Sequence, residues 1–127
     1  MHGSQPEFRV RSGNQILGYA REISGREWFS SDGLWWRGEK LVATGEVDET
    51  DWQRDACTSW RDANNRWVFS HDVLNVVWRN PFRGKWTAVV SFTADGHVLE
   101  RLSGLRVNIE ELAFAKSFEV ISHDWLL

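Results

Sequence analysis

Residues 86–102 read WTAVVSFTADGHVLERL, and this segment decides the predicted fold. Two runs rich in apolar and β-branched residues, Trp86 to Thr93 and His97 to Leu102, flank the turn-forming stretch Ala94-Asp95-Gly96. Asp-Gly between two such runs is a strong local signal for a β-hairpin, because both residues tolerate the positive φ angles of a tight turn. The segment therefore predicts two antiparallel strands joined by a short turn.

Short strand-forming segments separated by Gly, Ser or Asp recur along most of the chain. Residues 7–20 predict a second hairpin, in which Phe8 and Val10 alternate with charged residues and Ser12-Gly13-Asn14 supplies the turn. The remaining predicted strands are Glu27 to Phe29, Leu34 to Trp36, Lys40 to Ala43, Trp67 to Phe69, Val73 to Trp78 and Phe118 to Ile121. This density of strands and turns predicts one domain, residues 1–127, that is mainly β and forms a small antiparallel barrel or meander.

Two segments predict short helices within this β fold. Trp52, Ala56 and Trp60 recur at a spacing of four behind an acidic run, and Ala63 follows three residues later. This pattern predicts a helix from about Thr50 to Trp60. Residues 108–116 begin with an N-cap asparagine, continue with early acids and end with a lysine. This order predicts a two-turn helix before the last strand, so we expect one or two short helices in all.

Composition limits the class of protein and of partner. The 127 residues carry a net charge of −3, so no global positive field attracts nucleic acid or an anionic membrane. The single cysteine, Cys57, forms no internal disulfide, and the N-terminal residues lack the apolar region of a signal peptide. No stretch approaches the roughly 20 apolar residues of a membrane span. We therefore expect a cytoplasmic protein that does not bind membranes and uses no cofactor.

Tryptophan is the residue type that stands out, with nine in the chain. Each buried indole N–H needs an acceptor, and nine such donors are hard to satisfy in one small core, so we expect one to three tryptophans on a groove or interface. Trp35 and Trp36 are adjacent, and neighbouring strand residues point to opposite faces, so only one of them can enter a single core. The other is predicted to lie at a site of self-association or partner binding.

The segment WRNPFRGKW, residues 78–86, is the strongest candidate for a binding element. One loop punctuated by Pro and Gly holds its cations and aromatic rings, namely Trp78, Arg79, Phe82, Arg83, Lys85 and Trp86. Guanidinium and ammonium groups neutralise phosphate while an aromatic face stacks on a base, so contact with a polyanion or a carbohydrate is one interpretation. The alternative is a hairpin loop whose two tryptophans pair across strands into the core and whose cations keep it soluble.

The tripeptide Ser-His-Asp occurs twice, at residues 70–72 and 122–124, each time after an apolar strand residue. Consecutive strand residues alternate between faces, so neither tripeptide forms a catalytic triad by itself, and the two would have to pair with each other. The favoured interpretation is structural, with serine and aspartate capping or ending a strand. The sharper hypothesis is a shared metal, although the spacing matches no compact ligand motif; its ligands would be His71, His97 and His123 with Asp72 or Asp124.

Two further groups of residues receive a structural interpretation. An acidic run lacks the glycine and the final glutamate of a calcium loop, so a solvated helix start is favoured over a cation site; it comprises Glu46, Asp48, Glu49, Asp51 and Asp55. Cys57 has no identifiable base or second thiol beside it in the sequence. It is therefore expected to pack as a small apolar residue.

Five segments, taken in order along the chain, carry a family resemblance: an opening Phe8 to Arg11, a polar turn Arg61 to Arg66, a segment Val68 to Leu74, a hairpin Val89 to Gly96 and a closing strand Phe118 to Ile121. Their order and spacing resemble the YopX-like proteins of phages and prophages. His71 stands where that family usually has glycine. The resemblance implies a complex β-barrel of unassigned biochemical role, carried on mobile DNA, and it transfers no catalytic residue.

The sequence leaves three functions open. The leading one is a non-enzymatic accessory protein of bacterial or phage origin that presents an aromatic surface to a protein partner or to its own copy. The second is an enzyme that uses His71 or His123 with Asp72 or Asp124 for acid–base or metal chemistry. The third is a small nucleic-acid-binding barrel that uses the loop of residues 78–86, which the net charge disfavours.

Overall fold

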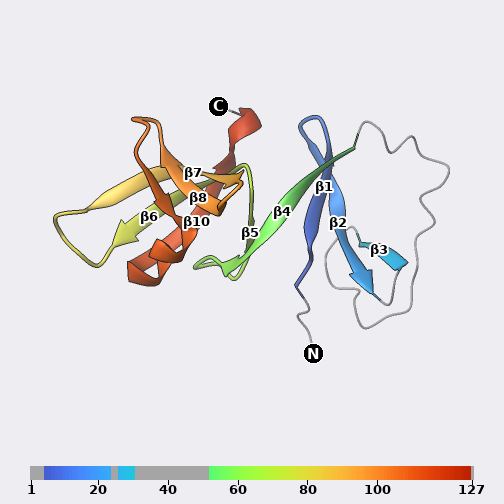
Figure 1. Cartoon of the computed structure of the whole chain (residues 1–127), viewed down its shortest axis with the longest axis horizontal. Helices are drawn as coiled ribbons and strands as arrows, with labels where there is room; N and C mark the ends of the chain where they lie inside the picture. Colours follow the sequence, from blue (N-terminus) through green and yellow to red (C-terminus); the bar gives the residue numbers. More distant parts are fainter. Residues whose placement is uncertain (1–4, 24–25, 31–51, 127) are drawn as a thin grey trace. The chain divides into compact units, whose positions relative to one another are not determined.

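The computed structural model describes residues 5–23, 26–30 and 52–126, and within these ranges the protein is mainly β (Figure 1). Its strands form two antiparallel five-stranded sheets, which confirms the predicted fold class. No helix among these residues is long and apolar enough to cross a membrane. The strands predicted at Leu34 to Trp36 and at Lys40 to Ala43 lie outside the described residues.

The chain divides into two compact units, residues 1–57 and residues 58–127. The division falls inside one strand, β4 (Trp52–Arg61), so each unit contains part of that strand. The single domain inferred from the sequence stays a prediction.

The first sheet has the strand order β3-β2-β1-β4-β5. Besides β4, its strands are β1 (Phe8–Ser12), β2 (Gln15–Ile23), β3 (Arg26–Ser30) and β5 (Trp67–Phe69). β1 and β2 form the predicted hairpin, with Ser12 paired to Gln15 across the turn. Gly13 in this turn has a φ of 58°, a left-handed conformation that glycine adopts without steric cost.

The helix predicted from about Thr50 to Trp60 is wrong, because residues 52–61 form strand β4. A spacing of four residues is a multiple of the two-residue period of a strand, so the pattern of tryptophans and alanines fits a strand as well as a helix. Pairing with β1 decides between the two structures: Phe8 is opposite Ala56, and Arg9 is opposite Asp55. The sequence pattern alone contains no information about this distant partner.

Asp55 is not part of a solvated helix start, because its side chain is buried beside two arginines of β1. Arg9 Nη2 and Arg11 Nε each lie 2.9 Å from Asp55 Oδ2. The side-chain exposure is 3% for Arg9, 10% for Arg11 and 1% for Asp55, so all three charges are largely removed from water. The two arginines are two residues apart, and strand periodicity therefore directs both to the face that meets Asp55. This charged cluster ties β1 to β4.

The second sheet has the strand order β10-β6-β7-β8-β9. Its strands are β6 (Asp72–Trp78), β7 (Lys85–Thr93), β8 (Gly96–Arg101), β9 (Arg106–Asn108) and β10 (Ala115–His123). β6 to β9 are neighbours both in sequence and in the sheet, so they form a meander, as predicted (Figure 1). β7 and β8 are the hairpin expected from residues 86–102, with Thr93 paired to Gly96. Neither sheet closes on itself in this part of the chain, so the barrel alternative is not formed there.

The core of the second unit consists of alternate residues of these strands together with Val68 of β5 and with Ile109 and Leu112 of η2. Side chains two residues apart on a strand point to the same face, which explains the repeated burial along β6 and β7. The buried cluster comprises Val68, Leu74, Val76, Trp78, Trp86, Ala88, Val90, Leu99, Ile109, Leu112 and Ala115. Full burial of a large apolar side chain contributes roughly 1.5–3 kcal/mol, so this cluster is the main stabilising element of the unit.

The predicted C-terminal helix is a short 3-10 helix, η2 (Ile109–Phe114). Asn108 caps it as expected, since its side chain accepts a hydrogen bond from the N–H of Glu110 at 2.8 Å. The helix ends at Phe114, two residues earlier than predicted, because Ala115 has extended backbone angles and begins β10. The N–H of Arg79 donates to the carbonyl of Phe114 at 3.2 Å, which fixes the end of η2 beside the loop that follows β6.

The polar turn between β4 and β5 is organised by the buried carboxylate of Asp62, which is 6% exposed. Its Oδ1 accepts hydrogen bonds from the N–H groups of Asn64 and Arg66 at 3.0 and 2.8 Å, and its Oδ2 accepts one from Val120 at 2.9 Å. The N–H of Ala63 donates to the carbonyl of Phe118 at 2.8 Å. The turn therefore covers part of the outer edge of β10, which would otherwise present unpaired backbone groups.

Candidate functional site

The loop between β6 and β7 has a backbone fixed by its own hydrogen bonds. Trp78 is the last residue of β6, and its N–H donates to the carbonyl of Gly84 at 2.9 Å. Asn80 organises the turn, since its side-chain Oδ1 accepts the N–H of Phe82 at 2.9 Å and its carbonyl accepts the N–H of Arg83 at 3.1 Å. Gly84 has a φ of 69°, which explains the glycine before β7 resumes. The loop is therefore a defined turn that presents its side chains in fixed directions.

Trp78 and Trp86 lie under the loop, as one of the two sequence interpretations predicted. Their rings meet edge to face, with centroids 5.1 Å apart and planes at 77°, a favourable geometry for an aromatic pair. They are only 3% and 4% exposed, so they belong to the core. Their contribution to any binding is to support the loop from below.

Arg83 is held in place by three contacts, so its charge is largely compensated. Its guanidinium carbon lies 4.2 Å from the ring centroid of Trp78 and 5.1 Å from that of Trp86, within the range of a cation–π interaction. Its Nη2 lies 3.0 Å from Oε1 of Glu111, which comes from η2. Arg83 therefore joins the loop to η2. Its guanidinium would have to give up these contacts to bind a phosphate, so phosphate binding by Arg83 is disfavoured.

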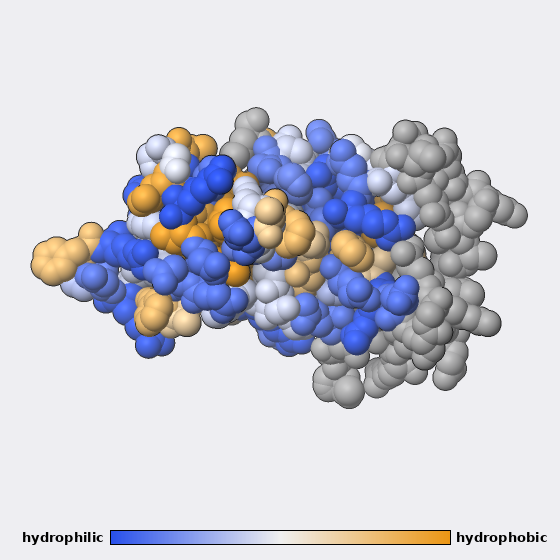
Figure 2. All heavy atoms as spheres, in the orientation of Figure 1, coloured by the Kyte–Doolittle hydropathy of each residue, from blue (hydrophilic) through white to orange (hydrophobic). Residues whose placement is uncertain are grey.

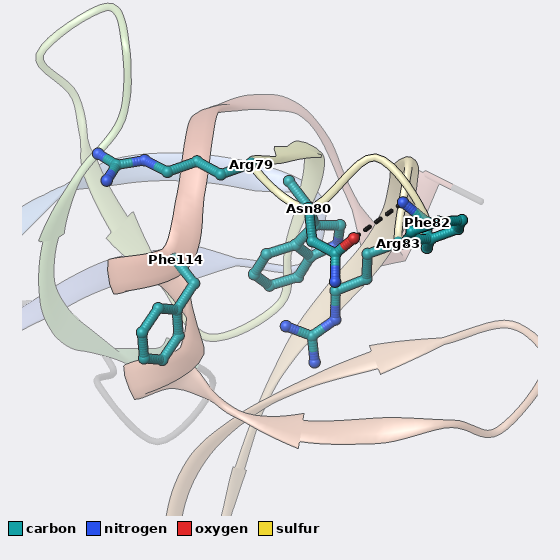
Figure 3. A pocket seen from close by; sticks show the side chains of 6 residues that line it. Arg79, Asn80, Phe82, Arg83 and Phe114 are labelled. Atoms are coloured by element: carbon teal, nitrogen blue, oxygen red, sulfur yellow. Dashed lines mark hydrogen bonds between the residues drawn. The ribbon is translucent and has the colours of Figure 1, made fainter.

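A hollow of about 540 Å³ lies between the loop and the end of η2 (Figure 3). Its lining consists of Trp78, Arg79, Asn80, Phe82, Arg83 and Phe114. Figure 3 shows Phe114 on one side of the hollow, Asn80 and Arg83 on the other, and Arg79 extending away from Arg83 along its rim. Phe82 is 98% exposed and Phe114 is 61% exposed, so two aromatic rings border the hollow and face solvent. Figure 2 shows this loop tip as an apolar point among hydrophilic residues, at the left of the view.

The predicted binding residues thus have different positions. Arg79, Phe82 and Arg83 line the hollow together with Trp78, whereas Lys85 begins β7 opposite Val77 and does not line it. Trp35 and Trp36 lie outside the described residues. The sequence reasoning missed Phe114, Asn80 and Glu111. Phe114 lies within the helix predicted over residues 108–116, but only the pairing of β10 with β6 brings it to this loop.

The two Ser-His-Asp tripeptides lie beside each other where β6 begins and β10 ends. His123 is the register partner of Asp72, and the same antiparallel geometry places His71 beside Asp124. His123 Nδ1 lies 2.9 Å from Asp72 Oδ1, and His71 Nδ1 lies 2.7 Å from Asp124 Oδ2. The two tripeptides therefore contribute two reciprocal His–Asp pairs, one at the end of the ladder and one just beyond it.

The His123–Asp72 pair is the more buried of the two. The side chain of Asp72 is 1% exposed, and its Oδ2 also accepts the N–H of Phe69 at 2.8 Å. The ring of His123 is stacked on that of Trp125, with centroids 4.5 Å apart and planes at 9°. In the tautomer with the proton on Nδ1, His123 donates a hydrogen bond to Asp72 Oδ1, and Nε2 is then the proton-accepting atom of the ring. The side chain of His123 is 23% exposed, so solvent reaches this residue.

The proposed metal ligands do not form a site in this part of the chain. Among residues 5–23, 26–30 and 52–126 no group of three or more His, Cys, Asp or Glu side chains is placed to hold a metal ion. His97 lies on β8, where its ring contacts Phe92 at a centroid distance of 4.6 Å. Cys57 is partly buried within β4.

Comparison of the chain with models of known protein families, with curated proteins and with solved structures finds no match.

Proposed function

We propose that this chain is a non-enzymatic binding protein that recognises a protein partner through the loop of residues 79–84 and the hollow beside it. The observation that carries the proposal is Phe82, which is 98% exposed at the tip of a loop whose backbone is fixed by Asn80. Large aromatic side chains on rigid loops act as anchors at protein interfaces, because they bury much apolar area and lose little conformational entropy. Without a binding partner, an exposed phenylalanine such as Phe82 would only lower the solubility of the protein.

A protein partner fits the charges of this loop better than a nucleic acid does. One of its three cations, Arg83, is stacked on two indoles and paired with Glu111, so two cations at most remain for phosphates. Two phosphate contacts on a single strand give a salt slope of about −1.4, which corresponds to weak binding. The net charge of −3 opposes nucleic acid further.

The proposal is tested by selecting peptides from a random library displayed on phage, with the full chain as the immobilised target. Affinities of the selected peptides are then measured by fluorescence anisotropy against wild type, Phe82→Ser and Phe92→Ser. Phe92 is the matched control, because it is also a phenylalanine with an exposed side chain, 63%, and it does not line the hollow. We expect Phe82→Ser to weaken binding at least about tenfold, as for an interface anchor, and Phe92→Ser to leave it unchanged.

Equal affinities for wild type and Phe82→Ser would contradict the proposal. A single-stranded oligonucleotide titrated at low and moderate salt provides the second arm. Binding of that oligonucleotide with a slope near −1.4, abolished by replacing Arg79 and Lys85, would favour the nucleic-acid function instead. Sedimentation of the wild type and of Phe82→Ser over a range of concentrations tests self-association, which the same exposed ring would mediate if the partner is a second copy.

A second candidate function is acid–base chemistry at His123. It is favoured by one observation: Nδ1 of His123 is bound to a buried carboxylate, which orients Nε2 as a proton acceptor. The described residues contain no nucleophile shown to be in contact with this nitrogen, so the simplest reaction is activation of water. In that reaction Nε2 takes a proton from water while the water oxygen attacks an ester carbonyl. The C–O bond to the leaving group then breaks, and the imidazolium returns the proton to the departing oxygen, which leaves as the alcohol.

Hydrolysis of p-nitrophenyl acetate tests this second function. His123→Gln and Asp72→Asn are compared with His97→Gln, which changes a histidine outside the two pairs. If the function is present, the first two variants lose the activity and the third retains it. Equal rates in all four proteins would exclude it. An unfolding curve for Asp72→Asn is needed as well, because this aspartate is buried.

The origin of the protein from a phage or prophage remains a proposal that depends on the resemblance to YopX-like proteins. His71, which departs from the glycine usual in that family, has a φ of 74°, a left-handed conformation that favours glycine. The cytoplasmic location is likewise a proposal from composition.

A further inference from the structure

The lining of the hollow separates into apolar walls and a polar rim. Phe114 on one side and Phe82 on the opposite side are the exposed apolar residues of the lining, with Trp78 beneath (Figure 3). The volume of about 540 Å³ lies within the range of roughly 300–1,000 Å³ that is typical of sites for small ligands. This volume is larger than that of a single side chain. A peptide that places one side chain in the hollow therefore also brings the adjacent residue of the peptide into contact with the rim.

The rim offers hydrogen-bond donors and one charge without a partner in the described part of the chain. Arg79 forms no ion pair with any described residue, in contrast to Arg83, which is paired with Glu111. The Oδ1 of Asn80 accepts the N–H of Phe82, and the Nδ2 of the same amide is a hydrogen-bond donor on the rim. The indole N–H of Trp78 is buried and finds no acceptor among the described residues.

A site that has donors and a positive charge to offer is complementary to an acceptor with negative charge. A carboxylate is the commonest such group in proteins, and its pairing with a guanidinium is charge-assisted. A buried N–H without an acceptor is also unfavourable, so an oxygen atom that reached Trp78 would remove that cost. The apolar walls require, in addition, a large apolar group next to the carboxylate.

We infer that the occupant of the hollow is an acidic peptide segment of the partner in which a large apolar side chain stands next to a carboxylate. The apolar side chain packs between Phe82 and Phe114, and the carboxylate binds Arg79. Arg83 is a positioning residue, since its contacts with Trp78, Trp86 and Glu111 hold the loop against η2. This inference rests on the proposed function and specifies the chemistry of its partner.

Three blocked dipeptides serve as probes: aspartyl-phenylalanine, asparaginyl-phenylalanine and aspartyl-alanine. The first pair differs only in the charge, and the third probe lacks the ring. Each is titrated into the full nitrogen-15-labelled chain at low salt, and the backbone amide shifts are followed in wild type, Arg79→Gln and Lys85→Gln. Lys85→Gln is the matched control, because it removes the same charge from a residue that does not line the hollow.

We expect aspartyl-phenylalanine to shift the amides of residues 79–84 and 114, with an affinity about twofold to fivefold above that of the asparaginyl probe, as for a solvent-accessible ion pair. Aspartyl-alanine leaves these amides unchanged. Arg79→Gln removes the preference for the charged probe, and Lys85→Gln retains it.

Equal affinity of the two phenylalanine probes for wild type would overturn the inference, as would equal effects of Arg79→Gln and Lys85→Gln. The absence of any shift at these amides up to about 10 mM probe would also overturn it, since even millimolar binding is then excluded. These results leave the proposed function standing if library peptides still depend on Phe82. The proposed function fails separately, when no selected peptide distinguishes Phe82→Ser from wild type.

Discussion

Replacement of Asp55 by alanine is expected to destabilise the first unit strongly. The substitution removes the acceptor of the charged hydrogen bonds from Arg9 and Arg11, whose side chains are 3% and 10% exposed. The two guanidinium groups then remain in a site that excludes water, with one counter-charge fewer. Breaking a buried ion pair from one side costs about 3–5 kcal/mol, because the remaining charge loses its compensation and is not resolvated.

The effect is large compared with the total stability of a small protein, which is about 5–15 kcal/mol. It is measured by urea unfolding followed through tryptophan fluorescence, with circular dichroism as a second probe in case the two units unfold separately. The control is Glu100→Ala, which breaks the solvent-accessible ion pair between Glu100 and Arg106. The side chain of Arg106 is 59% exposed and that of Glu100 is 34% exposed, so this substitution should cost at most about 1 kcal/mol. A loss below about 1 kcal/mol in Asp55→Ala would refute the reasoning, since surface pairs already account for that much.

Three further predictions follow from individual contacts. Asp62→Ala removes the acceptor of three backbone N–H groups, those of Asn64, Arg66 and Val120. It should lower the free energy of unfolding by about 1–3 kcal/mol or more, whereas Glu119→Ala, on the same edge of β10, should change it little. Phe82→Ser should change the free energy of unfolding by no more than about 0.5 kcal/mol, because the ring is 98% exposed. A clear loss of stability in this variant would mean that Phe82 is a core residue. Long-range nitrogen-15 NMR spectra should show that neutral His123 is protonated at Nδ1, and Asp72→Asn should remove this preference for one tautomer. Protonation at Nε2 in the wild type would contradict the hydrogen bond between His123 and Asp72.

Local signals in the sequence were sufficient for the turns and the hairpins. The Asp95-Gly96 turn and the Gly13 turn each place a residue with positive φ between two strand-forming runs, and both hairpins form where predicted. The N-cap at Asn108 is local in the same sense, because its hydrogen bond joins residues two positions apart. Such features depend on the backbone preferences of neighbouring residues and need no knowledge of the fold.

Features that depend on distant pairing were missed or left open. The pattern of Trp52, Ala56 and Trp60 fits both a helix and a strand, and β1, more than 40 residues earlier, selects the strand. The function of the Ser-His-Asp repeat could not be decided either, since its meaning lies in the register of β10 on β6. The same pairing brings Phe114 to the loop of residues 79–84. The candidate site was therefore half predicted: its loop from local composition, and its opposite wall not at all.

The most direct test of the account is a map of where a selected peptide binds. The backbone amide shifts of the full labelled chain are recorded with the tightest peptide from the library selection. We expect shifts concentrated at residues 79–84, in the loop, and at residues 109–116, in η2 and the residues that follow it. We expect these shifts to be lost in Phe82→Ser. Shifts concentrated instead at residues 92–97, around the control Phe92, or at residues 70–72 and 122–124 would contradict it.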